Sequence, residues 1–174
     1  RRDGVERVLD ELKENFDYIV CDSPAGIEHG AITALYFADS AIVVTNPEVS
    51  SVRDSDRIIG LLDSKTEKAE KGERIDKHLL ITRYDAARAE RGEMLKIEDV
   101  LEILSIPLLG IIPESQDVLK ASNVGTPVTL NNADSAPARA YVDASRRLMG
   151  QEVAMVVPTE RKGLMNRLLG RRAA

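Results

Sequence analysis

The hydrophobic residues of the chain form two alternating patterns. Mostly apolar runs of five or six residues lie at 16–21, 41–45, 78–82 and 108–112. Short runs of this kind are typical of strands that are buried on both faces. They predict four strands, and the first of them, Phe16–Cys21, is expected to be buried.

The segments between these runs repeat apolar residues every three or four positions, which predicts amphipathic helices. The predicted helices lie at residues 5–12, 31–38, 52–62, 97–104, 114–122 and 134–149. Ser50 or Ser51 is expected to cap the helix that begins near Val52. The charged stretch 65–77 is expected to be a solvated loop.

Strands that alternate with helices predict an α/β fold with a doubly wound, mostly parallel sheet, because parallel neighbours need crossover connections that helices supply. The 174 residues and 19.1 kDa fit a single domain. A content of 43% hydrophobic and 30% charged residues fits a soluble globular protein. Aromatic residues make up 3% of the chain, with no Trp, which argues against base stacking and therefore against a nucleic-acid partner.

Three side chains that often carry chemistry are expected to be structural here. Cys21 is the single cysteine, so no disulfide can form within the chain, and a cytoplasmic protein is expected. We expect Cys21 to pack within its apolar run rather than to act as a nucleophile. His29 and His78 have no partner residues at metal-ligand spacing.

The residues after the first apolar run indicate a ligand site, since ligands of open parallel sheets bind beyond the carboxyl ends of the strands. Asp22 follows the run directly, and a turn that contains Gly26 comes next. Nucleotide hydrolases use an acid in this position to hold Mg²⁺ near phosphate oxygens. The alternative is that Asp22 only opens an Asx turn.

Four motifs together resemble the deviant Walker-A ATPases of the ParA/MinD family. They read DSPAGIE at 22–28, TNPEVSSVRDSDR at 45–57, TRY at 82–84 and IPE at 112–114. The resemblance extends over essentially the whole chain. It implies a sheet of the P-loop NTPase type, ATP and Mg²⁺ as cofactors, and a homodimer that forms with ATP.

The resemblance also implies roles for individual residues. Asp22 corresponds to the acid that holds Mg²⁺ through water, and Gly26 lies in a switch segment that senses the terminal phosphate. Glu48 corresponds to a residue that contacts the nucleotide across the dimer interface. Arg83 and the loop from Pro113 to Asp117 correspond to the adenine side of the site.

Partner binding is implied for one helix surface. Asp54 and Asp56 correspond to residues that bind partner proteins, which in this family are the division inhibitor MinC and the activator MinE. A solvated helix end remains the alternative for these two residues and for Glu48. The same alternative, a solvated end of an element, remains for Arg83.

One expected motif is missing from the chain. None of its 11 glycines begins a G-x-x-x-x-G-K-[ST] loop, whose amides and Lys cradle phosphates. We therefore expect that an N-terminal part with a central strand is missing, and that this chain alone does not hydrolyse ATP. The alternative is a relative that kept the fold and lost the chemistry.

The C-terminal residues differ in charge from the rest of the chain. The net charge is -5, and residues 160–174 carry a local +4, which leaves -9 for residues 1–159. After a linker at 151–159, a predicted helix gathers its apolar residues on one side. The residues expected to contact a membrane are Lys162, Leu164, Met165, Arg167, Leu168 and Leu169. They predict reversible binding to anionic lipids, and the alternative is packing against the ATPase domain at 1–150.

Together these expectations describe a cytoplasmic ATPase that binds peripherally to the cytoplasmic face of the inner membrane. One amphipathic tail should bind weakly, and two tails on an ATP-dependent dimer should bind more tightly. The resemblance implies that such a protein positions the division septum, recruits a MinC-like inhibitor and is released by a MinE-like activator. The alternatives are a partition ATPase of the ParA type, which should lack the tail, and a non-enzymatic scaffold tethered to the membrane.

Overall fold

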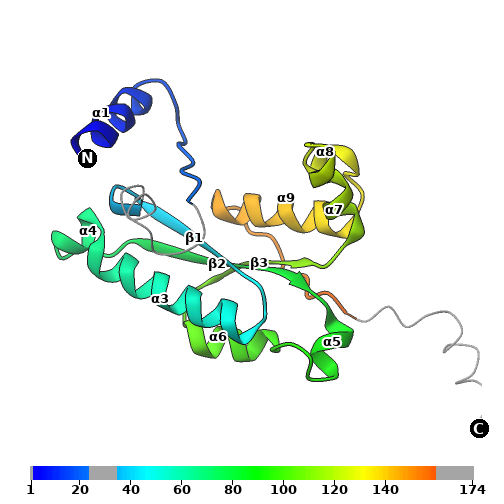
Figure 1. Ribbon diagram of the computed structural model, residues 1–174. Coiled ribbons are helices and arrows are strands. Elements are labelled where there is room, and N and C mark those ends of the chain that lie inside the picture. The colour runs from blue at the N-terminus through cyan, green and yellow to red at the C-terminus, as the bar shows by residue number, and fades with distance from the viewer. Residues whose placement is uncertain (1, 24–34, 160–174) are drawn as a thin grey trace, which may run out of the picture.

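The computed structural model describes residues 2–23 and 35–159. Within them, three parallel strands form a sheet in the order β1 (Ser40–Thr45), β2 (Asp76–Tyr84) and β3 (Leu108–Pro113) (Figure 1). Helices connect the strands along the chain. The predicted α/β fold with a parallel sheet is therefore confirmed.

One face of the sheet carries the main hydrophobic core. α3 (Val49–Lys65) and α6 (Ile97–Leu104) lie together on this face (Figure 1). Leu79 of β2 and Val100 of α6 belong to this core, and both are 0% exposed. Packing of aliphatic side chains from α3 and α6 against β2 therefore fixes the central strand.

The other face of the sheet is covered over β3 and open over β1. α9 (Ala136–Leu148) packs against β3, where a Cβ added at Gly110 would lie 3.0 Å from the Cβ of Ala144. Glycine at this position therefore lets the helix approach the strand closely. Ile42 and Val44 of β1 are 44% and 56% exposed. In the described residues no strand pairs with the outer edge of β1, so β1 lacks a cover on one face and a neighbour on one edge.

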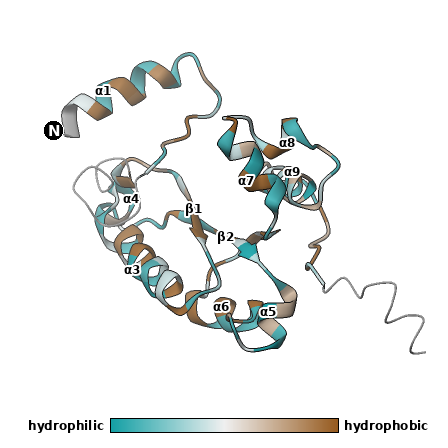
Figure 2. Cartoon of the chain, turned by 45° about the vertical axis from the view of Figure 1, so that its right-hand side comes forward, coloured by the Kyte–Doolittle hydropathy of each residue, from teal (hydrophilic) through white to brown (hydrophobic). Residues whose placement is uncertain are grey.

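The prediction of a buried strand at Phe16–Cys21 is wrong. This segment follows α1 (Arg2–Lys13) without forming a strand, and it passes outside the sheet in both views (Figures 1 and 2). Tyr18 and Val20 are 76% and 92% exposed, and Cys21 is exposed rather than packed as predicted. A strand needs a neighbour that takes up its backbone hydrogen bonds, and the described part of the chain places none beside this segment.

α3 begins earlier than predicted. Its first residue is Val49, and Glu48 is its N-cap, since the Val52 amide already donates to the Glu48 carbonyl at 2.9 Å. Ser50 and Ser51 therefore lie inside the first turn of the helix. The predicted serine cap is wrong for this reason.

The charged stretch 65–77 is only partly the loop that was predicted. The buried hydroxyl of Thr66 accepts a hydrogen bond from the Ala69 amide at 3.2 Å and starts the short helix α4 (Glu67–Glu70). The same hydroxyl donates to the Leu62 carbonyl near the end of α3 at 3.0 Å. One threonine thus joins two helices where the charge pattern indicated only solvated chain.

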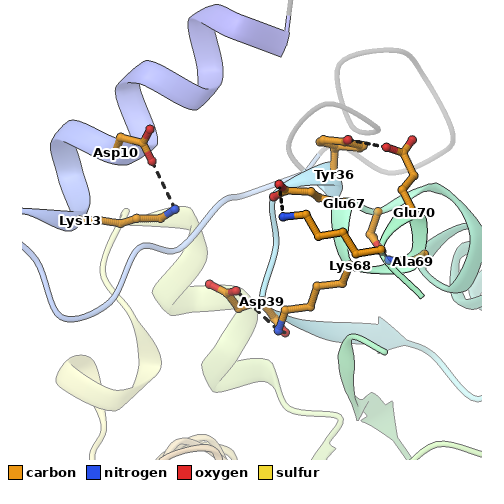
Figure 3. A network of polar contacts seen from close by, with 10 residues as sticks. Asp10, Lys13, Tyr36, Asp39, Glu67, Lys68, Ala69 and Glu70 are labelled. Atoms are coloured by element: carbon orange, nitrogen blue, oxygen red, sulfur yellow. Dashed lines mark hydrogen bonds and ion pairs between the residues drawn. The ribbon is translucent and has the colours of Figure 1, made fainter. Parts of the chain in front are cut away.

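Polar contacts tie α4 to the chain that leads into β1 (Figure 3). The Tyr36 hydroxyl donates to the Glu70 carboxylate at 2.6 Å. The Lys68 ammonium donates to the Asp39 carbonyl at 3.2 Å and lies 3.6 Å from the Asp39 carboxylate. These contacts hold the beginning of β1 against α4.

The other predicted helices are confirmed where they are long. α6 has the predicted bounds, while α1, α9 and α7 (Gln116–Asn123) match their predicted segments with shifted ends. α5 (Ala86–Glu90) and α8 (Val128–Asn131) were not predicted, because helices of four or five residues are too short to show a periodicity. The predicted helix at 31–38 lies mostly outside the described residues.

Residues 151–159 form neither helix nor strand, and the side chain of Arg147 holds them in place. Its guanidinium donates to the carbonyl groups of Val153 at 2.8 Å and Ala154 at 2.6 Å. It also donates to the Leu109 carbonyl in β3 at 2.9 Å. Arg147 therefore joins α9, β3 and the segment that leads to the C-terminus.

We expect Arg147→Ala to lower the free energy of unfolding by about 1–3 kcal/mol, because three carbonyl groups lose a charged donor. Urea unfolding followed by circular dichroism measures this loss. Arg146→Ala is the matched control, since that exposed guanidinium lies 3.7 Å from Asp143, and it should cost less than about 0.5 kcal/mol. Equal losses for the two variants would contradict the role given to Arg147.

Candidate functional site

The carboxyl ends of the three strands gather four of the six residues predicted to act in catalysis or nucleotide binding. Glu48 follows β1, Arg83 is the penultimate residue of β2, and Pro113 is the last residue of β3. Asp117 lies in the first turn of α7. Because the strands are parallel, these four residues lie at the same edge of the sheet.

Hydrogen bonds fix the end of β1 relative to β2 and to the loop before α6. The Thr82 hydroxyl donates to the Asn46 side-chain oxygen at 3.0 Å. The Leu95 amide donates to the carbonyl of the buried Pro47 at 2.9 Å. The backbone of Glu48 is thereby held in place while its side chain is exposed. An exposed carboxylate on a fixed backbone can contact a ligand or a second protein.

The backbone at Arg83 adopts a conformation that is rare for residues other than glycine. Its φ is 57°, in the left-handed region, where a side chain costs energy and where functional residues are often found. The Glu114 amide donates to the Tyr84 carbonyl at 2.9 Å and holds the next residue in register with β3. The Arg83 side chain is 65% exposed, and its guanidinium lies 3.3 Å from the Glu114 carboxylate. A cation is therefore displayed at the edge of the sheet.

A chain of alternating charges continues from this pair. The second Glu114 oxygen lies 3.7 Å from the Arg88 guanidinium in α5, and Arg88 lies 3.7 Å from Glu93. Arg91 donates twice to Glu93, at 2.6 and 3.1 Å, and these hydrogen bonds hold the pKa of the Glu93 carboxyl below its usual value. Arg88 and Glu93 were missed by the sequence analysis, because no motif or spacing links residues from β2, α5 and the loop after β3.

Asp117 is partly buried at the start of α7. Its backbone amide donates to the Ser115 hydroxyl at 3.1 Å, which caps the helix. Its carboxylate accepts a hydrogen bond from the Asn132 amide group at 3.4 Å. These contacts orient the loop between β3 and α7, so this loop can present backbone groups to a flat ligand.

The acidic pair lies on the outer surface of α3. Asp54 and Asp56 are both exposed, and the Asp54 carboxylate lies 3.4 Å from the Arg57 guanidinium. Val52 and Ile59 on the opposite side of the helix are buried in the core. The acidic side of the helix is thus exposed, and Asp54 and Asp56 are not part of the group of residues at the strand ends.

The structure does not place Asp22 at the end of a strand. Asp22 is exposed, and the strand that was expected to carry it does not form (Figure 1). Within the described ranges no group of three or more His, Cys, Asp or Glu residues could hold a metal ion. Among the described residues, Asp22 therefore belongs to no cluster of possible metal ligands.

Other predicted residues lie outside the described ranges. They are Gly26 and the proposed membrane-contacting residues Lys162, Leu164, Met165, Arg167, Leu168 and Leu169. In the part of the chain that is described, no helix has the length and apolar character needed to cross a bilayer.

The residues at the strand ends offer a cation and backbone groups side by side. The exposed Arg83 guanidinium can stack on an aromatic base, and the loop that starts at Pro113 supplies hydrogen-bonding backbone groups beside it. Groups that would cradle the phosphates are not found at this edge in the described residues. This edge of the sheet can therefore hold a flat aromatic group through Arg83 and the loop after β3.

The chain is similar to septum site-determining proteins over almost its whole length. It is 59% identical over 173 residues to the septum site-determining protein MinD of Escherichia coli (strain K12), an alignment that covers 97% of this chain and 63% of that protein. The protein of the same name from Neisseria meningitidis is 57% identical over 173 residues, which are 97% of this chain and 64% of that protein. The chain therefore spans a little less than two thirds of the length of these relatives. No protein-family model matches it.

Solved structures agree with these relatives. A chain of the MinC:MinD cell division protein complex from Aquifex aeolicus matches with a TM-score of 0.80 and 37% identity, covering 92% of this chain and 63% of that one. The septum site-determining protein MinD from Pyrococcus horikoshii, complexed with Mg-ADP, matches with a TM-score of 0.71 and 27% identity, covering 85% of this chain and 56% of that one. The three-stranded sheet is therefore part of a larger fold in these proteins.

Proposed function

We propose that this chain belongs to the MinD family and forms the larger part of an ATPase that positions the cell-division septum. The observation that carries the proposal is the 59% identity over 97% of the chain to a septum site-determining protein. The gathering of Glu48, Arg83 and Pro113 at one edge of the sheet supports it. We propose that the intact protein hydrolyses ATP and that these 174 residues alone do not.

ATP and Mg²⁺ are the proposed cofactors, and each predicted residue has a place in binding them. Arg83 and the loop from Pro113 to Asp117 hold the base. Glu48 reaches the nucleotide of the second subunit in a dimer, as its exposed side chain allows. Asp22 holds Mg²⁺ through water, and Gly26 lies in the switch that senses the terminal phosphate. When bound, the metal neutralises charge on the phosphate oxygens.

The open side of β1 supports the proposal that further chain completes the fold. Ile42 and Val44 are exposed on one face, and the outer edge of β1 has no partner strand in the described residues. The apolar segment Phe16–Cys21 is exposed as well. The remaining third of the relatives' length can supply a central strand that pairs with β1 and brings Asp22 to the edge of the sheet.

We also propose that the protein binds the membrane reversibly. The basic, apolar sequence at 160–174 binds anionic lipids on the cytoplasmic face of the inner membrane. Two such tails on an ATP-dependent homodimer act together and bind far more tightly than one. Asp54 and Asp56 form the exposed surface for a MinC-like inhibitor and for a MinE-like activator that releases the protein.

A vesicle assay tests this function. The protein for the assay is a chimera that joins this chain to the part of the Escherichia coli relative that it does not match. With ATP, we expect the chimera to sediment with anionic vesicles at least about 10-fold more than with ADP, because two linked tails bind more tightly than one. The same chimera without residues 160–174 should stay in the supernatant, and neutral vesicles should bind neither form.

Three outcomes would contradict parts of the proposal. Sedimentation that is equal with and without residues 160–174 would overturn the membrane role of the tail. Binding to vesicles without any ATP hydrolysis would favour the membrane-tethered scaffold. ATP-dependent binding to DNA in place of lipid would favour the partition ATPase.

A further inference from the structure

The Arg83 side chain lacks close packing that would fix its direction. It is 65% exposed and extends from a residue in the left-handed backbone region at the end of β2. The contact that orients its guanidinium in this structure is one Glu114 oxygen at 3.3 Å. The direction of the cation therefore depends on the position of Glu114.

Glu114 is in turn shared between two arginines. One of its oxygens faces Arg83, and the other lies 3.7 Å from the Arg88 guanidinium. The Arg88 side chain is 34% exposed, about half as much as that of Arg83. While Arg88 holds the second oxygen, Glu114 offers Arg83 a single oxygen rather than the two that a bidentate pair requires.

Arg88 itself is held by its helix and by a second acid. Asp85 is the N-cap of α5, and its carboxylate accepts a hydrogen bond from the Arg88 amide at 3.1 Å. The residue after Arg88, Ala89, is 2% exposed. The Arg88 guanidinium also lies 3.7 Å from Glu93. A charged group on a short, anchored helix therefore fixes Glu114 more firmly than an isolated surface pair would.

We infer that Arg88 is a positioning residue for the base side of the nucleotide site: by occupying one oxygen of Glu114, it keeps the Arg83 guanidinium free to stack on the base. This inference rests on the proposed function. Without Arg88, both Glu114 oxygens can capture Arg83 in a bidentate pair and turn the cation away from the base. Arg88 contacts no part of the nucleotide itself in this arrangement.

The experiment measures binding of N-methylanthraniloyl ADP to the chimera by fluorescence titration. Arg88→Ala should weaken binding roughly three- to tenfold, the range expected when one cation loses its place over an aromatic ring. Inorganic pyrophosphate, which has no base, should compete with unchanged affinity. Arg74→Ala removes an exposed arginine before β2, at the opposite end of the sheet, and should leave binding unchanged.

A second variant separates positioning from loss of structure. Glu114→Gln combined with Arg88→Ala removes the charge that would capture Arg83, so the double variant should regain affinity to within about twofold of the parent chimera. A variant that was merely less stable would not regain affinity in this way. Arg88→Lys should be intermediate, because a lysine offers one point charge in place of a planar fork.

The possible results lead to different conclusions. Unchanged binding by Arg88→Ala, in a chimera that binds the probe, would overturn the inference and leave the proposed function standing. Equal weakening of the probe and of pyrophosphate, without recovery in the double variant, would also overturn it. A parent chimera that binds no nucleotide would overturn the proposed function itself.

Discussion

Asp22→Asn is expected to lower the rate of ATP hydrolysis by the chimera about 100-fold or more, the loss typical when one electrostatic stabiliser is removed from a reaction site. Asparagine keeps the size of the side chain and removes the negative charge that would hold Mg²⁺ through water. The loss should appear in kcat, since the base side of the site is unchanged. Phosphate release at saturating ATP and Mg²⁺ measures it.

Asp17→Asn is the matched control for this experiment. Asp17 lies in the same segment after α1 and is also exposed, and the same change removes the same charge. Hydrolysis by this variant should stay within about twofold of the parent, as expected for an exposed residue outside the site. Similar losses for both variants would show that Asp22 acts only through the fold of its segment, as in the Asx-turn alternative.

Leu79→Ala is expected to lower the free energy of unfolding of the 174-residue chain by about 3–5 kcal/mol. Leu79 is 0% exposed in the central strand, where it lies between Val43 of β1 and Leu108 of β3. A loss of this size is a large part of the 5–15 kcal/mol that is typical for whole domains. Since β1 lacks a cover on one face, we expect the stability of this chain to lie at the low end of that range. The Leu79→Ala variant should therefore be largely unfolded. Urea unfolding followed by circular dichroism measures the change.

Ile42→Ala in β1 is the matched control for the core variant. Ile42 is 44% exposed on the open face of the sheet, so the change should cost less than about 1 kcal/mol in this chain. In the chimera, where further chain would cover this face, the same substitution should cost more. An equal cost in both proteins would contradict the proposal that β1 is covered in the complete fold.

Three of the four predicted strands formed because their neighbours are present in the same chain. β1, β2 and β3 pair with one another, and their apolar side chains pack against α3, α6 and α9. The run at 16–21 is also mostly apolar and forms no strand. A hydrophobic pattern reports which residues favour burial, and it does not report whether a partner strand is available.

The parts of the candidate site that depend on strand direction could be predicted from the sequence. The parts that depend on side-chain contacts could not. Glu48, Arg83 and Pro113 lie at one edge because parallel strands end on the same side. The left-handed backbone of Arg83 could not be predicted, since arginine carries no preference for it. The contact between Arg88 and Glu114 joins a five-residue helix to a loop 26 positions later, and no sequence period spans that interval.

The anchoring of the C-terminal segment would limit how the protein lies on a bilayer if the tail binds lipid as proposed. Arg147 pins Val153 and Ala154 to α9 and β3, and Met155 packs against the core. At most about 17 Å of extended chain then separates this anchor from residue 160, at roughly 3.4 Å per residue. A lipid-bound tail joined by so short a segment would keep the C-terminal end of α9 and the beginning of β3 close to the headgroups. The fold of each subunit would then set its orientation on the bilayer.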